Sequence, residues 1–302
     1  MPRIEVETTH PDRVLFPDDG ITKGDLVGYY TEIASTMLPH LKGRPLMVQR
    51  FPRGIDEQGF VQKDFEDALP NWMSWIEVEK QNGTVVHAVA DRSEALEWLA
   101  NQDCITPHAW LSQRGRLNDP DRMIFDLDPS GGADFTAVRA SAYTLADVLD
   151  GLGLVAYVQV TGSRGVHVVV PLDADADFDT ARQFARDVAD VVIADDPGQR
   201  TLEARKDRRG DRVYFDVMRN AYAQTAVAPY AVRARPGAPV ATPIEWSELD
   251  GASMRADLFT IRDVAKRVAD HGDPWADLGR HARSLSRPLD KLRRLSNASR
   301  AR

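Results

Sequence analysis

Two aspartates at the end of an apolar run constrain this chain more than any other feature. Met123-Ile-Phe-Asp-Leu-Asp-Pro129 is followed at once by the turn residues Ser130-Gly-Gly132. The apolar run predicts a buried strand, in which side chains at i and i+2 point to the same face. Asp126 and Asp128 would then lie side by side, and such carboxylates repel each other unless a proton or a cation separates them. Mg²⁺ or Mn²⁺ is the usual cation, and either commonly carries substrate phosphates. The alternative is two solvated acids before a turn.

A third carboxylate occurs in a second apolar run. Asp216 lies in the middle of the strand predicted over Arg212–Met218, where burial of an unpaired acid is costly. If this strand pairs with the first, three carboxylates converge. They could hold two divalent ions, which can clamp the attacking and leaving oxygens of a phosphoryl transfer. The alternative for Asp216 is a salt bridge to a neighbour such as Arg219.

A glycine-bearing turn, Thr161-Gly-Ser-Arg-Gly165, joins the strands predicted over 155–160 and 166–171. Such turns can expose successive backbone N–H groups to an anion, with a triphosphate as the natural ligand. Further donors would come from four side chains: Thr161, Ser163, Arg164 and His167. The turn is not a Walker loop, since no Lys-Ser/Thr pair or immediate helix follows it. A plain hairpin turn is the alternative.

The remaining pattern predicts an α+β protein with antiparallel sheet at its centre. Thr22-Lys-Gly-Asp25 has the form of a capping box that opens a helix. Helices are predicted over residues 23–39, from 93, over 133–149 and over 178–193, and in the last 45 residues. Further strands are predicted over residues 45–50, 84–90 and 225–232.

Composition indicates a cytoplasmic protein, and the motif resemblance given next implies that it is nucleoid-associated. The chain has 302 residues, 43% of them hydrophobic, with no apolar run of the roughly 18 residues that a membrane span needs. The N-terminus carries no signal-peptide core, and Cys104 is the only cysteine. The net charge of −8 argues against bulk coating of nucleic acid. Basic residues nevertheless gather in residues 205–212 and 280–302, which fits local phosphate contacts, or else solvated surface and a frayed tail.

Four motifs in this order resemble the polymerase domain of bacterial DNA ligase D, a member of the archaeo-eukaryotic primase superfamily. They are Phe125–Pro129, Thr161–His167, Tyr214–Asn220 and Thr225–Val240. The similarity runs from about Asp12 to about Leu249. The resemblance implies a stand-alone actinobacterial primase-polymerase type, with antiparallel-rich sheets flanked by helices. It implies one catalytic domain over residues 1–302, of which about 280–302 is a basic tail.

The same resemblance implies a nucleotidyltransferase that adds NTPs or dNTPs to a primer 3′-hydroxyl, often preferring Mn²⁺ and ribonucleotides. Asp126, Asp128 and Asp216 would bind two metal ions and serve as the catalytic acids. The positions that match nucleotide contacts are His108, Thr161, Ser163, Arg164, His167, Arg209, Arg219 and Arg233. Arg164 stands where a lysine is common, and Gln49 stands where a basic contact can occur.

The family also has a site for the 5′-phosphate of the downstream strand at a gap or break. Arg13, Lys23 and Arg50 match that site, with Arg13 in place of the usual lysine. Two adjacent aromatics that often stack on template bases are here Phe60-Val61, so only Phe60 can stack.

The implied partners are gapped or broken duplex DNA, with Ku and a DNA ligase as further candidates. The alternatives to repair synthesis are a primase that makes short primers and a DNA-end-binding scaffold without significant turnover. A Mn²⁺-dependent glycosyltransferase also uses an Asp-x-Asp pair, but the third acid and the His167 turn argue against it.

Overall fold

The computed structural model describes residues 3–300, with side chains as far as Arg294. The chain folds into two compact units, each assembled from separate stretches of sequence. Unit 1 comprises the residues up to Arg114 with Thr225–Thr242 and Asp257–Asp273, and unit 2 comprises Gly115–Gln224, Pro243–Ala256 and the residues from Pro274. No helix in the described part of the chain is long and apolar enough to cross a membrane.

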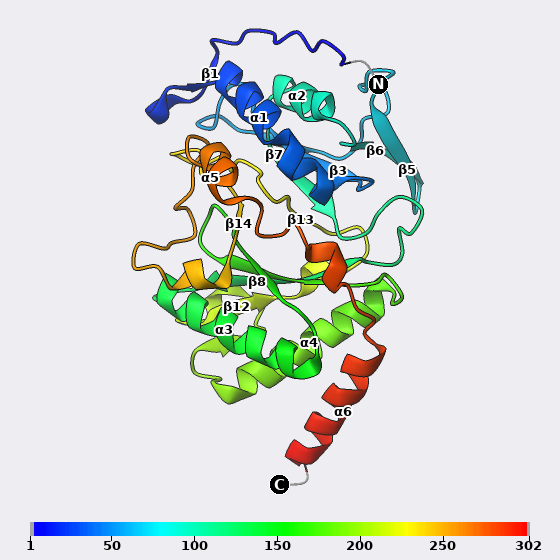
Figure 1. Ribbon diagram of the computed structural model, residues 1–302, viewed down its shortest axis with the longest axis vertical. Helices are drawn as coiled ribbons and strands as arrows, with labels where there is room; N and C mark the ends of the chain where they lie inside the picture. Colours follow the sequence, from blue (N-terminus) through cyan, green and yellow to red (C-terminus); the bar gives the residue numbers. More distant parts are fainter. Residues whose placement is uncertain (1–2, 301–302) are drawn as a thin grey trace. The chain divides into compact units, whose positions relative to one another are not determined.

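Unit 2 is built on a six-stranded sheet with two helices packed on one face (Figure 1). Its strands, in spatial order, are β11 (Arg200–Thr201), β12 (Val213–Asp216), β8 (Arg122–Pro129), β10 (Val166–Pro171), β9 (Tyr157–Val160) and β14 (Thr242–Ile244). The central strands pair antiparallel, and β11 pairs parallel to β12. The sheet thus places β8, which carries Asp126 and Asp128, between β12 and β10.

The helices of unit 2 bury apolar stripes at helical spacing. α3 (Phe135–Leu152) begins at the N-cap Asp134, whose carboxylate accepts from Ala137 N at 3.0 Å. α4 (Phe178–Asp195) begins in the same way at Asp177. The buried core includes Phe125, Leu127, Val138, Leu145, Val168, Phe184 and Phe215. α6 (Ser286–Arg300) contacts α3 and α4. Unit 2 also contains the 3₁₀ turns η2 (Lys206–Arg208), η3 (Met218–Asn220), η4 (Trp246–Asp250) and η5 (Leu278–His281).

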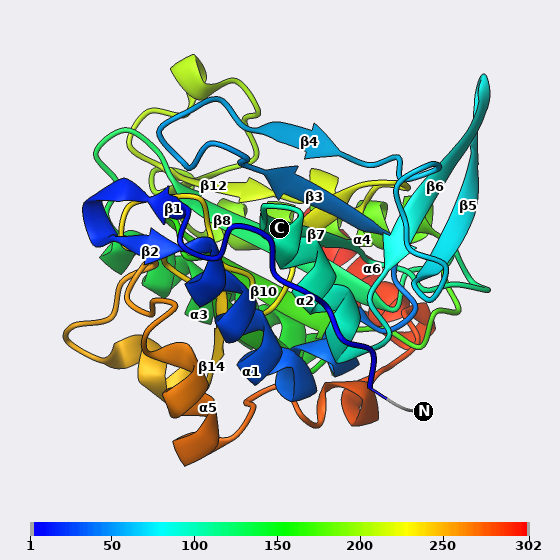
Figure 2. The same cartoon turned by 90° about the horizontal axis from the view of Figure 1, so that it is seen from above.

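Unit 1 packs α1 (Lys23–Leu41) and α2 (Ser93–Asn101) against a four-stranded sheet (Figure 2). The sheet order is β13 (Thr225–Val227), β7 (Cys104–Trp110), β3 (Leu46–Arg50) and the edge strand β4 (Phe60–Gln62). Two hairpins add β1 (Val14–Phe16) with β2 (Ile21–Thr22), joined by η1 (Pro17–Asp19), and β5 (Ser74–Lys80) with β6 (Gly83–Val89). α5 (Val264–His271) contacts α1. The predicted capping box at Thr22 and Asp25 is present at the start of α1.

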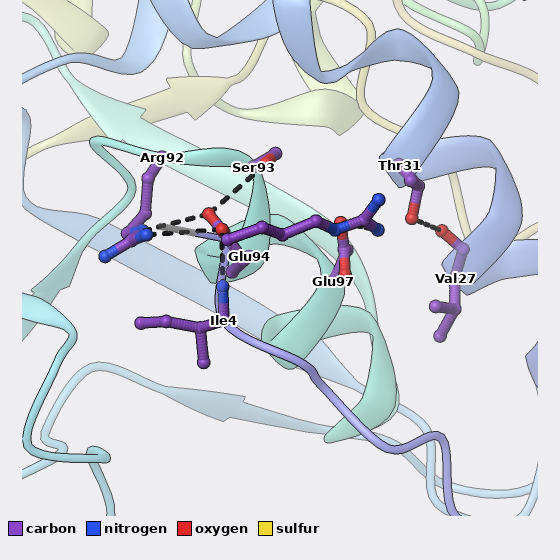
Figure 3. A network of polar contacts seen from close by, with 8 residues as sticks. Ile4, Val27, Thr31, Arg92, Ser93, Glu94 and Glu97 are labelled. Carbon is purple, nitrogen blue, oxygen red and sulfur yellow. Dashed lines mark hydrogen bonds and ion pairs between the residues drawn. The ribbon is translucent and has the colours of Figure 1, made fainter. Parts of the chain in front are cut away.

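The N-terminal segment of unit 1 is held along α2 by side-chain hydrogen bonds. Glu94 accepts from the backbone N of Ile4 at 3.0 Å and from Arg92 Nε at 2.9 Å (Figure 3). Arg3 forms an ion pair with Glu97 at 3.4 Å. The hydrogen bond from Arg92 lowers the pKa of the Glu94 carboxyl from 4.5 to about 2. Burial alone would raise this pKa, but its effect is the smaller of the two.

The α+β fold class is confirmed, while several predicted boundaries were wrong. The strand predicted over residues 225–232 ends at Val227, because the chain turns and Tyr230 adopts a left-handed φ of 66°. The strand predicted over residues 212–218 ends at Asp216, where the 3₁₀ turn η3 (Met218–Asn220) follows, so that Asp216 is terminal rather than central. Within the last 45 residues, the part that the structure describes (258–300) is helical only in α5, η5 and α6.

Candidate functional site

The carboxylates of unit 2 lie on neighbouring strands of one sheet. Asp126 of β8 is directly opposite Asp216 of β12 in the antiparallel register, and directly opposite His167 of β10 on its other side. Directly opposed residues have Cβ atoms about 4.5–5.5 Å apart. Asp128 lies two residues further along β8 and so on the same face. The convergence expected from the sequence is therefore a property of the strand register.

Burial makes this acid row electrostatically costly. Asp126 is only 9% exposed. Burial raises the pKa of Asp128, and the neighbouring charge of Asp126 raises it further. The neighbouring Arg164, His167 and Arg209 act in the opposite direction and lower the pKa of Asp128. Such a pair of carboxylates is a natural place for a cation.

The guanidinium of Arg219 approaches two of the acids in this structure. Its Nε lies 3.8 Å from Asp126 Oδ2 and 3.7 Å from Asp216 Oδ2. The ion pair between Asp216 and Arg219, which the sequence suggested as an alternative, is therefore present. It coexists with the pairing of Asp216 opposite Asp126. Arg219 reaches them because η3 is anchored to β8: the side chain of Asn220 bonds both the N–H and the C=O of Ile124, at 2.8 and 2.7 Å. The Arg219 side chain is 42% exposed, so it can move without disturbing the packed core.

The donor set suits hard divalent ions, although the side chains are not arranged as a finished metal site. Among the described residues, no group of three His, Cys, Asp or Glu side chains is positioned to hold a metal ion. Oxygen ligands from three carboxylates on one face are nevertheless what Mg²⁺ or Mn²⁺ requires. Asp216 also accepts from the backbone N–H of Met218 at 2.9 Å, so this carboxylate is held by η3 as well as by the Arg219 guanidinium.

The turn between β9 and β10 lies against β8. A Cβ atom at Gly165 would lie 1.9 Å from the carbonyl oxygen of Leu127, so only glycine fits there. The hydroxyl of Thr161 donates to Gly165 O at 3.0 Å and accepts from Gly165 N at 3.4 Å, and thereby closes the turn. Gly162, at φ 63°, donates its N–H to Ala256 O at 2.8 Å.

These bonds divide the predicted triphosphate contacts into two kinds. The Thr161 hydroxyl and the backbone N–H groups of Thr161 and Gly165 bond within the turn, and the N–H of Gly162 bonds to Ala256 O, so none of these donors faces an open site. Ser163 is half-buried, Arg164 is exposed, and His167 Nε2 lies 3.5 Å from Asp126 Oδ1. The side chains suited to an anion are therefore those of Ser163, Arg164 and His167.

Arg209 contributes a fixed positive charge to unit 2. Its guanidinium stacks on the ring of Tyr214 with 3.6 Å between Cζ and the ring centroid, and donates to the carbonyls of Glu203 and Ala204 at 2.9 Å each. Tyr214 lies opposite Asp128 in the sheet. Arg209 follows η2 (Lys206–Arg208), within the basic run 205–212.

Two other residues expected near the nucleotide belong to unit 1. His108 lies on β7, opposite Met47 on one side and Val227 on the other. Arg233 donates its backbone N–H to Pro239 O at 2.7 Å. Gln49, where a basic contact can occur in the family, lies on β3 opposite Thr106 and Val61.

The three residues matched to a 5′-phosphate site gather in unit 1, and we call them the cation cluster: Arg13, Lys23 and Arg50. Lys23 is 2% exposed, and burial lowers its pKa. Asp103 opposes that effect, whereas the charges of Arg13 and Arg50 add to it. Lys23 is also the first residue of α1, whose N-terminus favours anions. A cavity of about 410 Å³ beside the cluster is lined by His10, Asp12 and Arg13.

Phe60 lies next to this cluster. It is 48% exposed on the edge strand β4, directly opposite Arg50 on β3. The Arg50 guanidinium carbon lies 5.3 Å from the centroid of the Phe60 ring. Val61 is likewise exposed, at 53%.

Sequence reasoning missed the residues that hold the cation cluster. Thr9 accepts from Lys23 Nζ at 2.9 Å, and Asp103 forms an ion pair with Arg13. Arg50 Nε donates to the backbone oxygen of Gln102 at 2.6 Å. Asp103, an acid directly before the apolar run that begins at Cys104, was the one sequence signal that could have pointed to these contacts. The other contacts involve a common polar side chain or a backbone oxygen, which have no distinctive sequence pattern.

With this geometry established, the family of the chain is clear. Residues 22–275 match the model of the LigD primase-polymerase domain, and the chain belongs to that family. The polymerase domain of Mycobacterium tuberculosis ligase D, solved in complex with DNA, has a TM-score of 0.86 and 31% sequence identity. That match covers 92% of this chain and 99% of the solved one. The resemblance drawn from the four motifs is therefore confirmed.

Full-length relatives are longer than this chain. The multifunctional non-homologous end joining DNA repair protein LigD of M. tuberculosis is 33% identical over 302 residues, which cover 97% of this chain and 39% of the relative. The bifunctional non-homologous end joining protein LigD of Bacillus subtilis is 29% identical over 295 residues, with 97% and 47% covered. The chain thus spans less than half the length of these relatives.

Proposed function

We propose that this chain is a templated nucleotidyltransferase that adds NTPs or dNTPs to a primer 3′-hydroxyl by two-metal catalysis. The observation that carries the proposal is the register of β12, β8 and β10, which sets Asp216, Asp126 and His167 in one row. Family membership and the DNA-bound relative support the reaction class.

Asp126, Asp128 and Asp216 would hold two divalent ions, Mn²⁺ or Mg²⁺. When bound, such ions lower the pKa of the attacking hydroxyl and neutralise the charge of the triphosphate. Arg164, Ser163 and His167 would bind phosphate oxygens through charge-assisted and neutral hydrogen bonds. Arg209 supplies fixed positive charge next to β8, since Tyr214 and two carbonyls hold it in place.

The proposed substrate is duplex DNA with a short gap or a broken end that carries a downstream 5′-phosphate. The cation cluster would bind that phosphate, and Phe60 would stack on a template base. The likeness to LigD proteins favours a role in non-homologous end joining, with Ku and a DNA ligase as partners. Incorporation of ribonucleotides belongs to the same proposal.

Primer extension tests this proposal. The substrate is a duplex with a gap of one to three nucleotides, with or without the downstream 5′-phosphate, supplied with Mn²⁺ or Mg²⁺ and with each NTP or dNTP. Phosphate-stimulated extension by the wild type but not by Asp126→Ala is the expected result. Phosphate-independent extension would favour primer synthesis, and DNA binding without extension would favour a scaffold.

A further inference from the structure

Three consecutive residues at the end of α2 hold the cation cluster together. Asn101 closes the helix, and Gln102 and Asp103 lead into β7. Each of the three contacts a cation of the cluster, directly or through one intermediate residue. All of these residues belong to unit 1.

Asp103 is the counter-ion of two of the cations. Its Oδ1 accepts from Arg13 and lies 3.7 Å from Lys23 Nζ. The side chain of Lys23 is 2% exposed and that of Asp103 is 9% exposed, so neither charge is well hydrated. A buried charge is strongly destabilising without a partner. Asp103 also has a left-handed φ of 63°, which allows the chain to turn from α2 into β7.

Gln102 holds the third cation through its backbone. Its carbonyl oxygen accepts from Arg50 Nε at 2.6 Å, while its own N–H bonds back to the last turn of α2. Carbonyls at a helix C-terminus carry partial negative charge, which favours an arginine at this position. The other end of the guanidinium donates to Gln62 Oε1 at 2.8 Å, so that Arg50 is fixed from two sides.

Asn101 acts on Lys23 through Thr9. Its Oδ1 accepts from the Thr9 N–H at 3.0 Å and from the Thr9 hydroxyl at 3.2 Å, and its Nδ2 donates to Glu7 O at 2.9 Å. The same hydroxyl accepts from Lys23 Nζ at 2.9 Å. The bonds of Glu94 and Glu97 to the N-terminal segment, described above, hold the same segment further back along α2.

We propose that Asn101, Gln102 and Asp103 form a positioning element that preorganises Arg13, Lys23 and Arg50 to bind a terminal phosphate, with Asp103 as its principal residue. The inference rests on the proposed role of the cation cluster. Preorganisation lowers the cost of binding because the cations are ordered before DNA arrives.

The charge balance fits a terminal phosphate better than an internal one. Three cations and the Asp103 carboxylate leave a net charge of +2 within the cluster. The Asp12 carboxylate lines the adjoining cavity, but it is exposed, so water screens its charge more than that of the buried Asp103. A phosphate monoester carries about −1.5 to −2 at neutral pH, whereas an internal phosphodiester carries about −1. Without the Asp103 carboxylate, Arg13 is free to turn into solvent, and Lys23 loses the partner that offsets its burial.

Binding measured without nucleotide or divalent metal isolates this site from catalysis. Fluorescence anisotropy would compare a one-nucleotide gapped duplex that carries a downstream 5′-phosphate with the same duplex that carries a 5′-hydroxyl. The variants are Asp103→Asn and Thr9→Val. Asp91→Asn is the matched control, because Asp91 forms an ion pair with Arg114 at 2.6 Å elsewhere in unit 1. Thermal melting of each variant checks the fold.

For the wild type we expect about tenfold tighter binding of the phosphorylated duplex. Asp103→Asn and Thr9→Val should bring that ratio close to one and leave binding of the 5′-hydroxyl duplex unchanged, whereas Asp91→Asn should keep the wild-type ratio. A retained ratio in both site variants would overturn the inference, as would a larger ratio in Asp103→Asn, which would make Asp103 a competitor of the phosphate.

A wild-type ratio of one would refute the phosphate site and the inference together, while the polymerase reaction would stand, since no nucleotide is present. If Asp103→Asn does not fold, Thr9→Val decides the question alone.

Discussion

Asp216 lies directly opposite Asp126 across the antiparallel pair of β12 and β8, and the guanidinium of Arg219 approaches both carboxylates. One cation thus serves two acids that would otherwise repel each other. Arg219 thereby offsets the charge of the two carboxylates, as a divalent ion would do in the proposed reaction.

Replacement of Arg219 should therefore affect stability in a metal-dependent way. We expect Arg219→Gln to lower the melting temperature of the metal-free protein by a few degrees, since a half-exposed ion pair contributes about 1 kcal/mol or less. Saturating Mn²⁺ should abolish or reverse the difference, because the ion replaces the lost positive charge. Thermal melting with and without Mn²⁺ measures both effects.

Arg182→Gln is the control, because it removes an exposed ion pair with Asp179 on α4 of the same unit. Its small effect should not depend on Mn²⁺. An equal loss in Arg219→Gln at all Mn²⁺ concentrations would contradict the account.

Gly165→Ala should disrupt the turn beside the acid row. The new Cβ would meet the Leu127 carbonyl oxygen at 1.9 Å, so the turn must move away from β8. We expect a loss of about 2 kcal/mol or more in the free energy of unfolding and a loss of extension activity. Denaturant unfolding and primer extension measure the two.

Gly151→Ala provides the matched comparison. Gly151 lies in α3 with no atom within 4 Å of the added Cβ, so the change should stabilise the protein by about 0.5–1 kcal/mol. Wild-type stability in Gly165→Ala would show that the turn is not constrained by β8.

Glu94 should give unit 1 a pH-dependent stability. Its pKa in the folded protein is about 2, below the ordinary 4.5, so its stabilisation is complete above pH 4.5 and is lost as the pH falls toward 2. Glu94→Gln should cost about 2 kcal/mol at pH 7, and the gap to the wild type should shrink steadily below pH 4.5. Urea unfolding at several pH values between 7 and 3 measures this gap, and a gap that stays constant over the range would refute the assignment.

Phe60 should contribute to binding of the template strand. Base–aromatic stacking is worth about 1–3 kcal/mol per base, so Phe60→Ala should weaken binding of a gapped duplex by roughly tenfold. Trp75→Ala is the control, because Trp75 is a similarly exposed aromatic, at 53%, on β5. Equal effects of the two changes on binding would argue against a specific role for Phe60.

Much of the fold could be predicted because its signals are local. The capping box at Thr22 and the apolar periodicity of α1, α3 and α4 are contained in short stretches of sequence. The ends of strands were harder to predict. β13 stops at Val227 although apolar residues continue to Val232, because the chain turns at Tyr230. The left-handed backbone of Tyr230 depends on packing elsewhere in unit 1, which the local sequence does not show.

The candidate site divides in the same way. Asp126 and Asp128 share a face by strand geometry alone, but the placement of Asp216 beside them depends on a register that only the folded sheet defines. The contacts at Asn101–Asp103 join residues between 52 and 92 positions apart, and one of them uses a backbone carbonyl, which side-chain identity does not reveal.

The most direct test of the account is single-turnover extension of a gapped primer in Mn²⁺ by Asp126→Asn and Asp216→Asn. Both changes keep side-chain volume and remove one ligand charge, so the account predicts a loss of at least about 100-fold in rate with the melting temperature retained. Extension by folded Asp216→Asn at the wild-type rate would contradict it, because Asp216 would then serve only as a structural partner of Arg219.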